Sequence, residues 1–196
     1  MKIEVRADET VKITGYVNVV ERESRPVITT RGRVNEQIES GVFERALAEA
    51  GAVSMTIDHI ADREVANTAN GTLFLKEDAI GLRAKAIVSD KTVVQAAKEK
   101  KIKGWSFGMR NVQDSIEERA ERLPLRRIKK LSLDHITLVI GKTPVYSATS
   151  VELRADKEED IETRAFADEV DFCVEEKRAE IDYSAYEERL NRLKGE

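Results

Sequence analysis

The chain has 196 residues, of which 41% are hydrophobic and 36% are charged, and its net charge is −4. This mild acidity argues against a nucleic-acid binder, which carries a strongly basic surface, and no apolar run approaches the roughly 18–20 residues of a membrane-spanning helix. The charged N-terminus lacks the apolar stretch of a secretory signal, and one cysteine with two histidines is too little for a disulfide or a structural zinc site. We therefore expect a soluble intracellular protein without a cofactor, a metal, a nucleic-acid partner or a membrane partner.

Alternating apolar residues predict strands along most of the chain, and apolar spacings of three and four predict two helices. In chain order, the expected strands lie at residues 11–20, 26–30, 52–57, 72–75, 81–88, 104–112 and 128–140, and the expected helices at 40–50 and 91–103. The charged segment 113–127 is expected to be a loop or a short helix. Many strands with only two helices argue against a doubly wound α/β fold. The pattern instead predicts an α+β fold in which a closed or strongly curved antiparallel sheet is flanked by helices.

The C-terminal region carries most of the negative charge. Residues 155–196 have 15 acidic and 7 basic side chains, whereas residues 1–154 have a net charge of +4. Tyr186, Leu190 and Leu193 lie at helical spacing within this region. We expect a folded domain at 1–154 and an acidic tail at 155–196 that is partly helical or disordered. A packaging or self-processing segment and a plain spacer are both open interpretations of this tail.

Three side chains form the one set with coherent chemistry: Ser106, His59 and His135. Each histidine follows an apolar residue and an aspartate, in the runs I-D-H-I at 57–60 and L-D-H-I at 133–136. A half-buried histidine bound to a backbone carbonyl is the ordinary reason for such a position, but a histidine is also the usual general base near neutral pH. The sequence has no phosphate-binding or zinc-protease motif that would suggest other chemistry.

Ser106 lies between two glycines in the run G-W-S-F-G at 104–108. Flanking glycines allow the close backbone approach that a nucleophile and its oxyanion donors need, although a bulge or tight packing is the commoner reason for them. The run also fits the G-x-S-x-G elbow of an esterase-type hydrolase, which needs a helix directly after the serine and a histidine later in the chain. A strand is expected after Ser106 and His59 precedes it, which argues against the elbow.

Six motifs in chain order resemble the prohead maturation proteases of tailed bacteriophages. Members of that family open with a Gly-Tyr strand, continue with a helix start of the type E-x-I…G-x-F, an apolar strand ending in His and a hairpin, and then have G-x-S-F-G and a final L-x-E-V-S strand. The matching segments here are residues 14–17, 36–43, 53–59, 71–82, 104–108 and 133–139, followed by Pro144, Tyr146 and Thr149.

The resemblance implies a serine endopeptidase whose fold is similar to the herpesvirus assembly protease, a curved β-barrel wrapped by helices. It implies that Ser106 is the nucleophile and His59 its base. The family's glutamate falls on His135, which implies a Ser-His-His triad and a slower enzyme, because a neutral histidine stabilises an imidazolium less than a carboxylate does. Asp134 is the competing third member. We favour His135 because neighbouring strand residues point to opposite faces, so that Asp134 would point outward.

The resemblance also implies a substrate and a location. The expected partner is the precursor of the phage major capsid protein, or a scaffolding protein, and the enzyme would cut the scaffolding segment and itself inside the assembling prohead, in the bacterial host cytoplasm. The herpesvirus comparison adds a homodimer. The alternative is a catalytically inactive capsid-assembly or scaffolding protein that keeps the fold. The departure at His135 favours this alternative, and the intact Ser106 and His59 oppose it.

Overall fold

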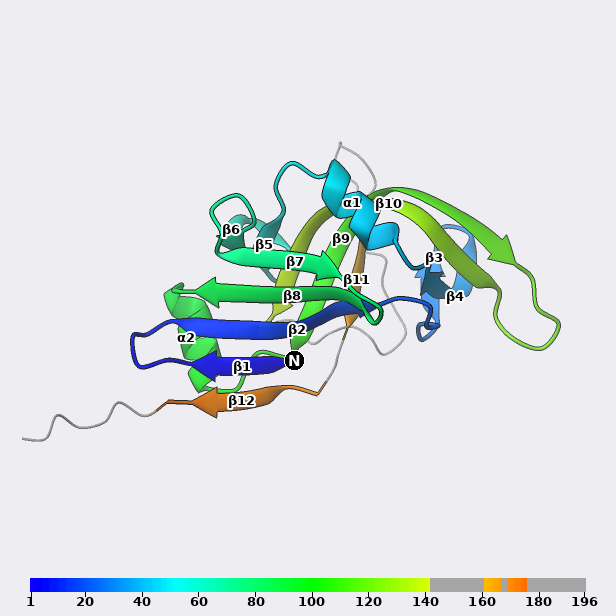
Figure 1. The fold of residues 1–196 in the computed structure, drawn as a ribbon. Coiled ribbons are helices and arrows are strands. Elements are labelled where there is room, and N and C mark those ends of the chain that lie inside the picture. Colours follow the sequence, from blue (N-terminus) through cyan, green and yellow to red (C-terminus); the bar gives the residue numbers. More distant parts are fainter. Residues whose placement is uncertain (142–160, 167–168, 176–196) are drawn as a thin grey trace, which may run out of the picture.

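The computed structural model describes residues 1–141, 161–166 and 169–175, which form two β-sheets and two helices (Figure 1). This mostly β architecture with two helices agrees with the predicted α+β class. The predicted helix near the C-terminus and the motif residues at 144–149 lie outside the described residues.

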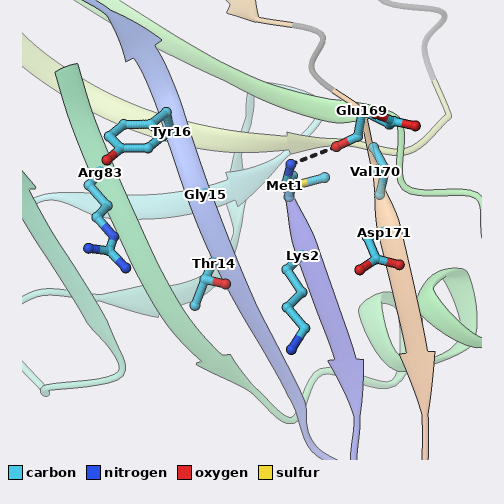
Figure 2. Close-up of a pocket in the computed structure, with 9 residues that line it drawn as sticks. All are labelled: Met1, Lys2, Thr14, Gly15, Tyr16, Arg83, Glu169, Val170 and Asp171. Carbon is cyan, nitrogen blue, oxygen red and sulfur yellow. Dashed lines mark hydrogen bonds between the residues drawn. The ribbon is translucent and has the colours of Figure 1, made fainter. Parts of the chain in front are cut away.

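One sheet has five strands and contains the N-terminus. Its spatial order is β12 (Asp171–Val174), β1 (Lys2–Val5), β2 (Val11–Val19), β8 (Gly81–Val88) and β7 (Leu73–Glu77). An open pocket beside this sheet is lined in part by Met1, Tyr16, Arg83 and Glu169 (Figure 2). The Met1 ammonium donates a hydrogen bond of 2.6 Å to the Glu169 carbonyl there, which ties the N-terminus to the residues just before β12.

The other sheet has seven strands. Five of them follow the spatial order β11 (Glu162–Phe166), β9 (Gly104–Glu117), β10 (Leu125–Val139), β4 (Gly32–Ile38) and β3 (Val27–Thr29), and the hairpin of β5 (Ser54–Ile57) and β6 (Ile60–Asn67) joins β10. The long β10 pairs with β9 along one edge, whereas β4 and β5 share its other edge, β4 near its start and β5 near its end. This length allows β10 to connect segments that are far apart in the sequence.

The helices α1 (Val42–Glu49) and α2 (Lys91–Lys98) confirm the two predicted helices. Helix α1 contacts β10 and β7, and α2 contacts β1 and β2. The side chain of Asp90 caps α2 by accepting hydrogen bonds from the backbone N–H groups of Thr92 and Val93 in the first turn. Within the described part of the chain, neither helix has the length and apolarity that crossing a membrane requires.

A hydrophobic core lies between the two sheets and includes side chains from β2, β8, β9 and β10. Strand β9 contributes Trp105, Phe107 and Met109, and Phe107 packs edge-on against Phe43 of α1 with ring centroids 5.5 Å apart. Successive side chains of a strand point to opposite faces. The even-numbered residues at the start of β9, from 104 to 110, therefore belong to the face that is turned away from this core.

The predicted closure into a barrel is wrong, whereas most of the strand pairs are antiparallel as predicted. The described strands form two open sheets, and the pairs β1–β12, β4–β10 and β5–β10 are parallel. Residue alternation identifies a strand but not its neighbour or its direction, because the same alternation suits either pairing. Similarity to the herpesvirus fold stays a prediction.

The predicted loop or short helix at 113–127 is also wrong. Strands β9 and β10 both extend into this segment, so that only residues 118–124 connect them. The charges that suggested a solvated loop pair across the hairpin, as in the ion pair of 3.2 Å between Arg127 and Glu117.

Two segments of the predicted acidic tail are strands in the structure. Strand β11 pairs antiparallel with β9, and β12 pairs parallel with β1. Sequence reasoning did not predict these short, mixed-polarity strands, nor β1, β4 and β6. In β4 the buried Glu36 takes a place where an apolar residue would have completed the alternation. The domain boundary after residue 154 stays a prediction.

Candidate active site

Ser106 lies in β9 on the face that is turned away from the core. The register between β9 and β10 places Ser106 opposite Thr137 and Gly108 opposite His135. Directly opposite residues of an antiparallel pair project from the same face of the sheet. This register therefore brings His135 and Thr137 to the serine, whose side chain is almost fully buried.

His59 reaches the same face from the tip of the β5–β6 hairpin. Asp58 and His59 are the two turn residues and have φ values of 49° and 60°, as a tight type I′ hairpin turn requires. The Asp58 carboxylate accepts hydrogen bonds of 2.9 Å from the backbone N–H groups of Ile140 and Gly141, and the His59 N–H donates to Thr137 Oγ1 at 3.1 Å. These contacts hold the turn against the end of β10.

Four side chains form a continuous row of short contacts. Ser106 Oγ lies 2.7 Å from His59 Nε2, and His59 Nδ1 lies 2.7 Å from His135 Nε2. His135 Nδ1 then lies 2.6 Å from Asp134 Oδ2. The structure thus brings all three predicted site residues together and adds Asp134 as a fourth member.

The carboxylate at the end of this row determines where each proton lies. An ionised Asp134 can only accept, so His135 carries its proton on Nδ1 and presents Nε2 as an acceptor. His59 then donates from Nδ1, which makes its Nε2 the acceptor for the Ser106 hydroxyl. With both rings neutral, every donor faces an acceptor, and the row is arranged to take a proton from the serine.

Asp134 reaches His135 because β10 is irregular at this point. The register shifts between Leu133 and His135, and the extra residue of a β-bulge does not follow the strict alternation of a strand. The prediction that Asp134 points away from His135 is therefore wrong. The hydrogen bond from His135 lowers the pKa of Asp134 despite its partial burial, and the ion pair with Arg110 lowers it further.

The second glycine of the G-W-S-F-G run has a steric role. A Cβ atom added to Gly108 would lie 2.5 Å from Cε1 and 2.8 Å from Nδ1 of His135. Both distances are shorter than a van der Waals contact allows, so the imidazole occupies the space that a side chain at this position would need.

Strand β11 covers Ser106 at the edge of β9 that does not pair with β10. Ala165 is the register partner of Ser106, and the Ser106 hydroxyl donates a hydrogen bond of 2.8 Å to the carbonyl oxygen of Arg164. A hydroxyl has one proton, which can go to this carbonyl or to His59 but not to both. Strand β11 therefore competes with His59 for the serine proton.

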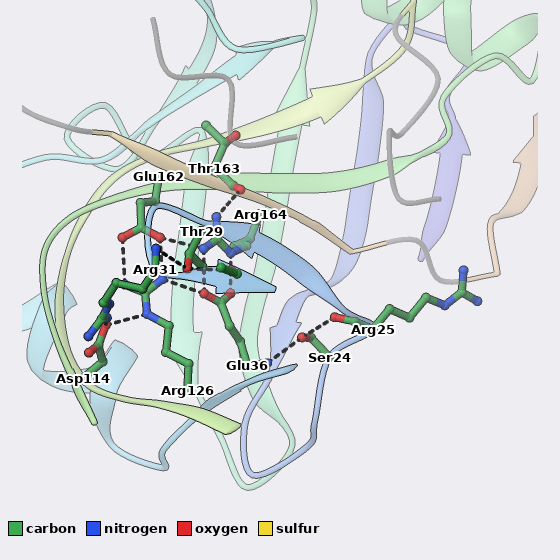
Figure 3. Close-up of polar contacts among 11 residues, drawn as sticks. Ser24, Arg25, Thr29, Arg31, Glu36, Asp114, Arg126, Glu162, Thr163 and Arg164 are labelled. Carbon is green, nitrogen blue, oxygen red and sulfur yellow. Dashed lines mark hydrogen bonds and ion pairs between the residues drawn. The ribbon is translucent and has the colours of Figure 1, made fainter. Parts of the chain in front are cut away.

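Buried ion pairs hold β11 in this position (Figure 3). The Arg164 guanidinium donates to both carboxylate oxygens of Glu36, with 2.6 Å between Nη2 and Oε1. Glu162 accepts hydrogen bonds of 2.6 and 2.8 Å from Arg126, which also binds Glu36 at 2.7 Å and Asp114 at 2.5 Å. Such buried charges are stable only when they are paired in this way.

The described residues offer no obvious alternative site for this chemistry. The pocket of Figure 2 does not include Ser106, His59 or His135, and the described ranges contain no cluster of His, Cys, Asp and Glu that could hold a metal ion. The esterase hypothesis is wrong, because β9 continues as a strand from Ser106 to Glu117 where the elbow requires a helix.

Sequence reasoning missed the buried ion-pair cluster. Its members lie on β4, β9, β10 and β11, and their charges resemble those of a solvated surface when they are read one segment at a time. The one available signal was Glu36, a charged residue between the apolar Val34 and Ile38 of β4.

A family model described as caudovirus prohead serine protease matches residues 1–164. The matched range includes Ser106, His59, His135 and Asp134. A search of curated proteins found no match to this chain.

We expect Gly108→Ala to displace His135 and to lower the free energy of unfolding by roughly 1–3 kcal/mol, as overpacking does in a tight interior. Urea unfolding measures this loss. Gly51→Ala is the matched control, because an added Cβ there meets no heavy atom within 4 Å. Equal stability of the two variants would contradict the steric role of Gly108.

The ion pairs of Glu162 predict a pH dependence of stability. Burial alone would raise the pKa of Glu162, but the hydrogen bond from Arg126 and the charges of Arg164 and Arg126 lower it below the ordinary 4.5. The stabilisation is therefore complete above pH 4.5 and is lost as the pH falls through the lower folded-state pKa. We expect Glu162→Gln to melt below wild type at pH 7 and the gap to shrink towards pH 3.

The matched control for this series is Glu118→Gln, at an exposed position, which we expect to melt as wild type does throughout. Thermal unfolding of the three proteins between pH 7 and pH 3 makes the comparison. A gap between wild type and Glu162→Gln that stays constant over this range would show that the Glu162 charge does not stabilise the fold.

Proposed function

Because the chain belongs to the caudovirus prohead serine protease family, we propose that it is a serine endopeptidase with the catalytic triad Ser106, His59 and His135. The observation that carries this proposal is the pair of 2.7 Å contacts that join the serine to His59 and His59 to His135. A nucleophile beside a base that is itself oriented by a third group is the general arrangement for covalent peptide hydrolysis.

His59 accepts the hydroxyl proton on Nε2 while Ser106 Oγ attacks the peptide carbonyl carbon, and it then delivers this proton to the leaving amine. Water hydrolyses the resulting acyl-enzyme with the same base. The proton on His59 Nδ1 stays hydrogen-bonded to His135, and His135 stays hydrogen-bonded to the ionised Asp134. The carboxylate thereby stabilises the His59 imidazolium through one intervening ring, which is a weaker effect than direct contact.

The proposed substrate is the scaffolding segment of a phage capsid precursor, together with the protease itself. The family description supports this substrate, and it supports a location inside the assembling prohead in the host cytoplasm. Confinement in a capsid raises the effective concentration of enzyme and substrate, so a slow protease can act there and remain inactive when it is dilute. The intact row of contacts opposes the inactive-scaffold alternative.

We expect the wild-type chain, incubated at high concentration, to become truncated, and the Ser106→Ala variant to stay whole. Intact-mass spectrometry over time measures both. A fluorophosphonate probe should label wild type and miss Ser106→Ala, because the probe needs an activated serine. Unlabelled wild type that also stays intact would argue against the proposed activity.

We expect Asp134→Asn to reduce Ser106-dependent cleavage by roughly 10- to 100-fold, because an amide can donate to His135 and reverse the direction of protons along the row. The rate of cleavage and a melting curve separate this effect from unfolding. Asp62→Asn, which makes the same charge change at an exposed position of β6, should leave the rate unchanged. Equal rates for the two variants would remove Asp134 from the mechanism.

A further inference from the structure

Strand β11 occupies the place where a substrate would meet the proposed nucleophile. It extends the sheet at the open edge of β9, with its Arg164 carbonyl oxygen 2.8 Å from Ser106 Oγ. Peptide substrates and inhibitors commonly bind as an added strand at a sheet edge, where the backbone gives affinity and alternate side chains give specificity. The backbone of β11 makes this kind of contact from within the same chain.

The β11 side chains Glu162 and Arg164 are charged, and each pairs with opposite charges. Glu162 and Arg164 are two positions apart, and both contact the buried cluster on the same side of the strand (Figure 3). Arg164 meets Glu36, whereas Glu162 meets Arg126 through both of its carboxylate oxygens. Paired contacts between guanidinium and carboxylate groups have a fixed geometry and therefore discriminate against other side chains.

The charged groups that contact β11 would also bind another peptide with the same arrangement of charges. Glu36 is a buried carboxylate that pairs with Arg164, and Arg126 is a buried guanidinium that pairs with Glu162. An extended peptide with an acidic residue, any residue and then an arginine would satisfy both groups. A peptide with an uncharged residue in place of the arginine would leave the Oε2 atom of Glu36 without the hydrogen bond that Arg164 donates. Losing that bond in a buried site lowers the affinity for the peptide.

The same short pattern recurs in the sequence. Glu-x-Arg-Ala is the sequence of β11 around Arg164, and it occurs five times in the chain, at residues 4–7, 117–120, 152–155, 162–165 and 176–179. Three of the five copies follow residue 150. The C-terminal region therefore repeats the pattern that the groove holds.

We propose that the edge of β9 beside Ser106 is the peptide-binding groove, that β11 is a segment of the same chain bound there as a substrate, and that Glu36 and Arg126 select the pattern acidic-x-Arg with cleavage after the arginine. This inference rests on the proposed protease function. Ser106 Oγ forms a bond to the arginine carbonyl carbon while its proton passes to His59. The bond from that carbon to the alanine nitrogen breaks, and the amine takes the proton from His59. Water then releases a peptide that ends in an arginine carboxylate.

The contact in the structure is a resting arrangement of this groove. The Ser106 hydroxyl donates to the Arg164 carbonyl oxygen, and its proton must turn to His59, 2.7 Å away, before the carbonyl carbon can be attacked. As long as β11 stays in place, it excludes other peptides. A substrate in trans therefore has to displace a strand that is anchored by the Glu36 and Arg126 ion pairs.

The test uses the full chain and three synthetic peptides that are identical except at two positions. The first contains Glu-Thr-Arg-Ala-Phe, the second has Gln in place of the arginine, and the third has Gln in place of the glutamate. We expect wild type to cut the first peptide between Arg and Ala, to cut the second at least about tenfold more slowly, and to cut the third at an intermediate rate. The Ser106→Ala variant should cut none. Mass spectrometry identifies the bond, and self-cleavage fragments should end at Arg154, Arg164 and Arg178.

The affinity of the peptides for variants that cannot cut them tests the groove independently of catalysis. The Ser106→Ala, Arg164→Ala double variant cannot cut and lacks the arginine that anchors β11. If it does not fold, the Ser106→Ala, Glu162→Gln double variant serves, because it lacks instead the carboxylate that pairs with Arg126. Fluorescence anisotropy with the labelled peptides should give a Kd at least about tenfold lower for the first peptide than for the second.

The outcomes separate the groove from the proposed activity. Ser106-dependent cleavage that is equally fast with Arg and Gln, or that occurs at another bond, overturns the groove and leaves the protease standing. Selective binding without any cleavage by wild type supports the groove and contradicts the protease. Equal or absent binding of the first two peptides, together with no cleavage after arginine, overturns the groove.

Discussion

The antiparallel register between β9 and β10 is the constraint on which the candidate site depends. It places Ser106 opposite Thr137 and Gly108 opposite His135, and a slip of one residue would move every one of these side chains to the other face of the sheet. The core fixes that register from behind, because Trp105 and its alternate neighbours in β9 fill the space between the two sheets. Packing on one face of β9 therefore sets the geometry on the other face.

The irregular point in this pairing is as important as the regular part. A perfectly alternating β10 would carry Asp134 to the opposite face from His135, and the row of contacts would end at a neutral ring. The register shift places the carboxylate 2.6 Å from His135 instead. The proposed Ser-His-His triad thus gains the negative charge of Asp134, which contacts the second histidine and not the first. This charge orients both imidazoles through the chain of hydrogen bonds.

The acidic C-terminal region contributes to the site as well as to the net charge. Strand β11 joins β9, and its carbonyl at Arg164 contacts Ser106. The ion pairs that hold this strand are buried at Glu36, Arg126 and Arg164 and half-buried at Glu162, and they gain strength from a surrounding of lower dielectric constant than water. Within the proposed function, a single element can thus limit access to the nucleophile and display the side chains that the groove accepts.

The strand-rich class, both helices and the set of candidate residues Ser106, His59 and His135 could be predicted from the sequence, because alternation, helical spacing and short motifs are local properties. The open sheets, the parallel pairings, the bulge that brings Asp134 to His135, and the cluster around Glu36 could not. Each of these depends on which segments become neighbours in space. That choice follows from packing and charge pairing across the whole chain, which no short stretch of residues encodes.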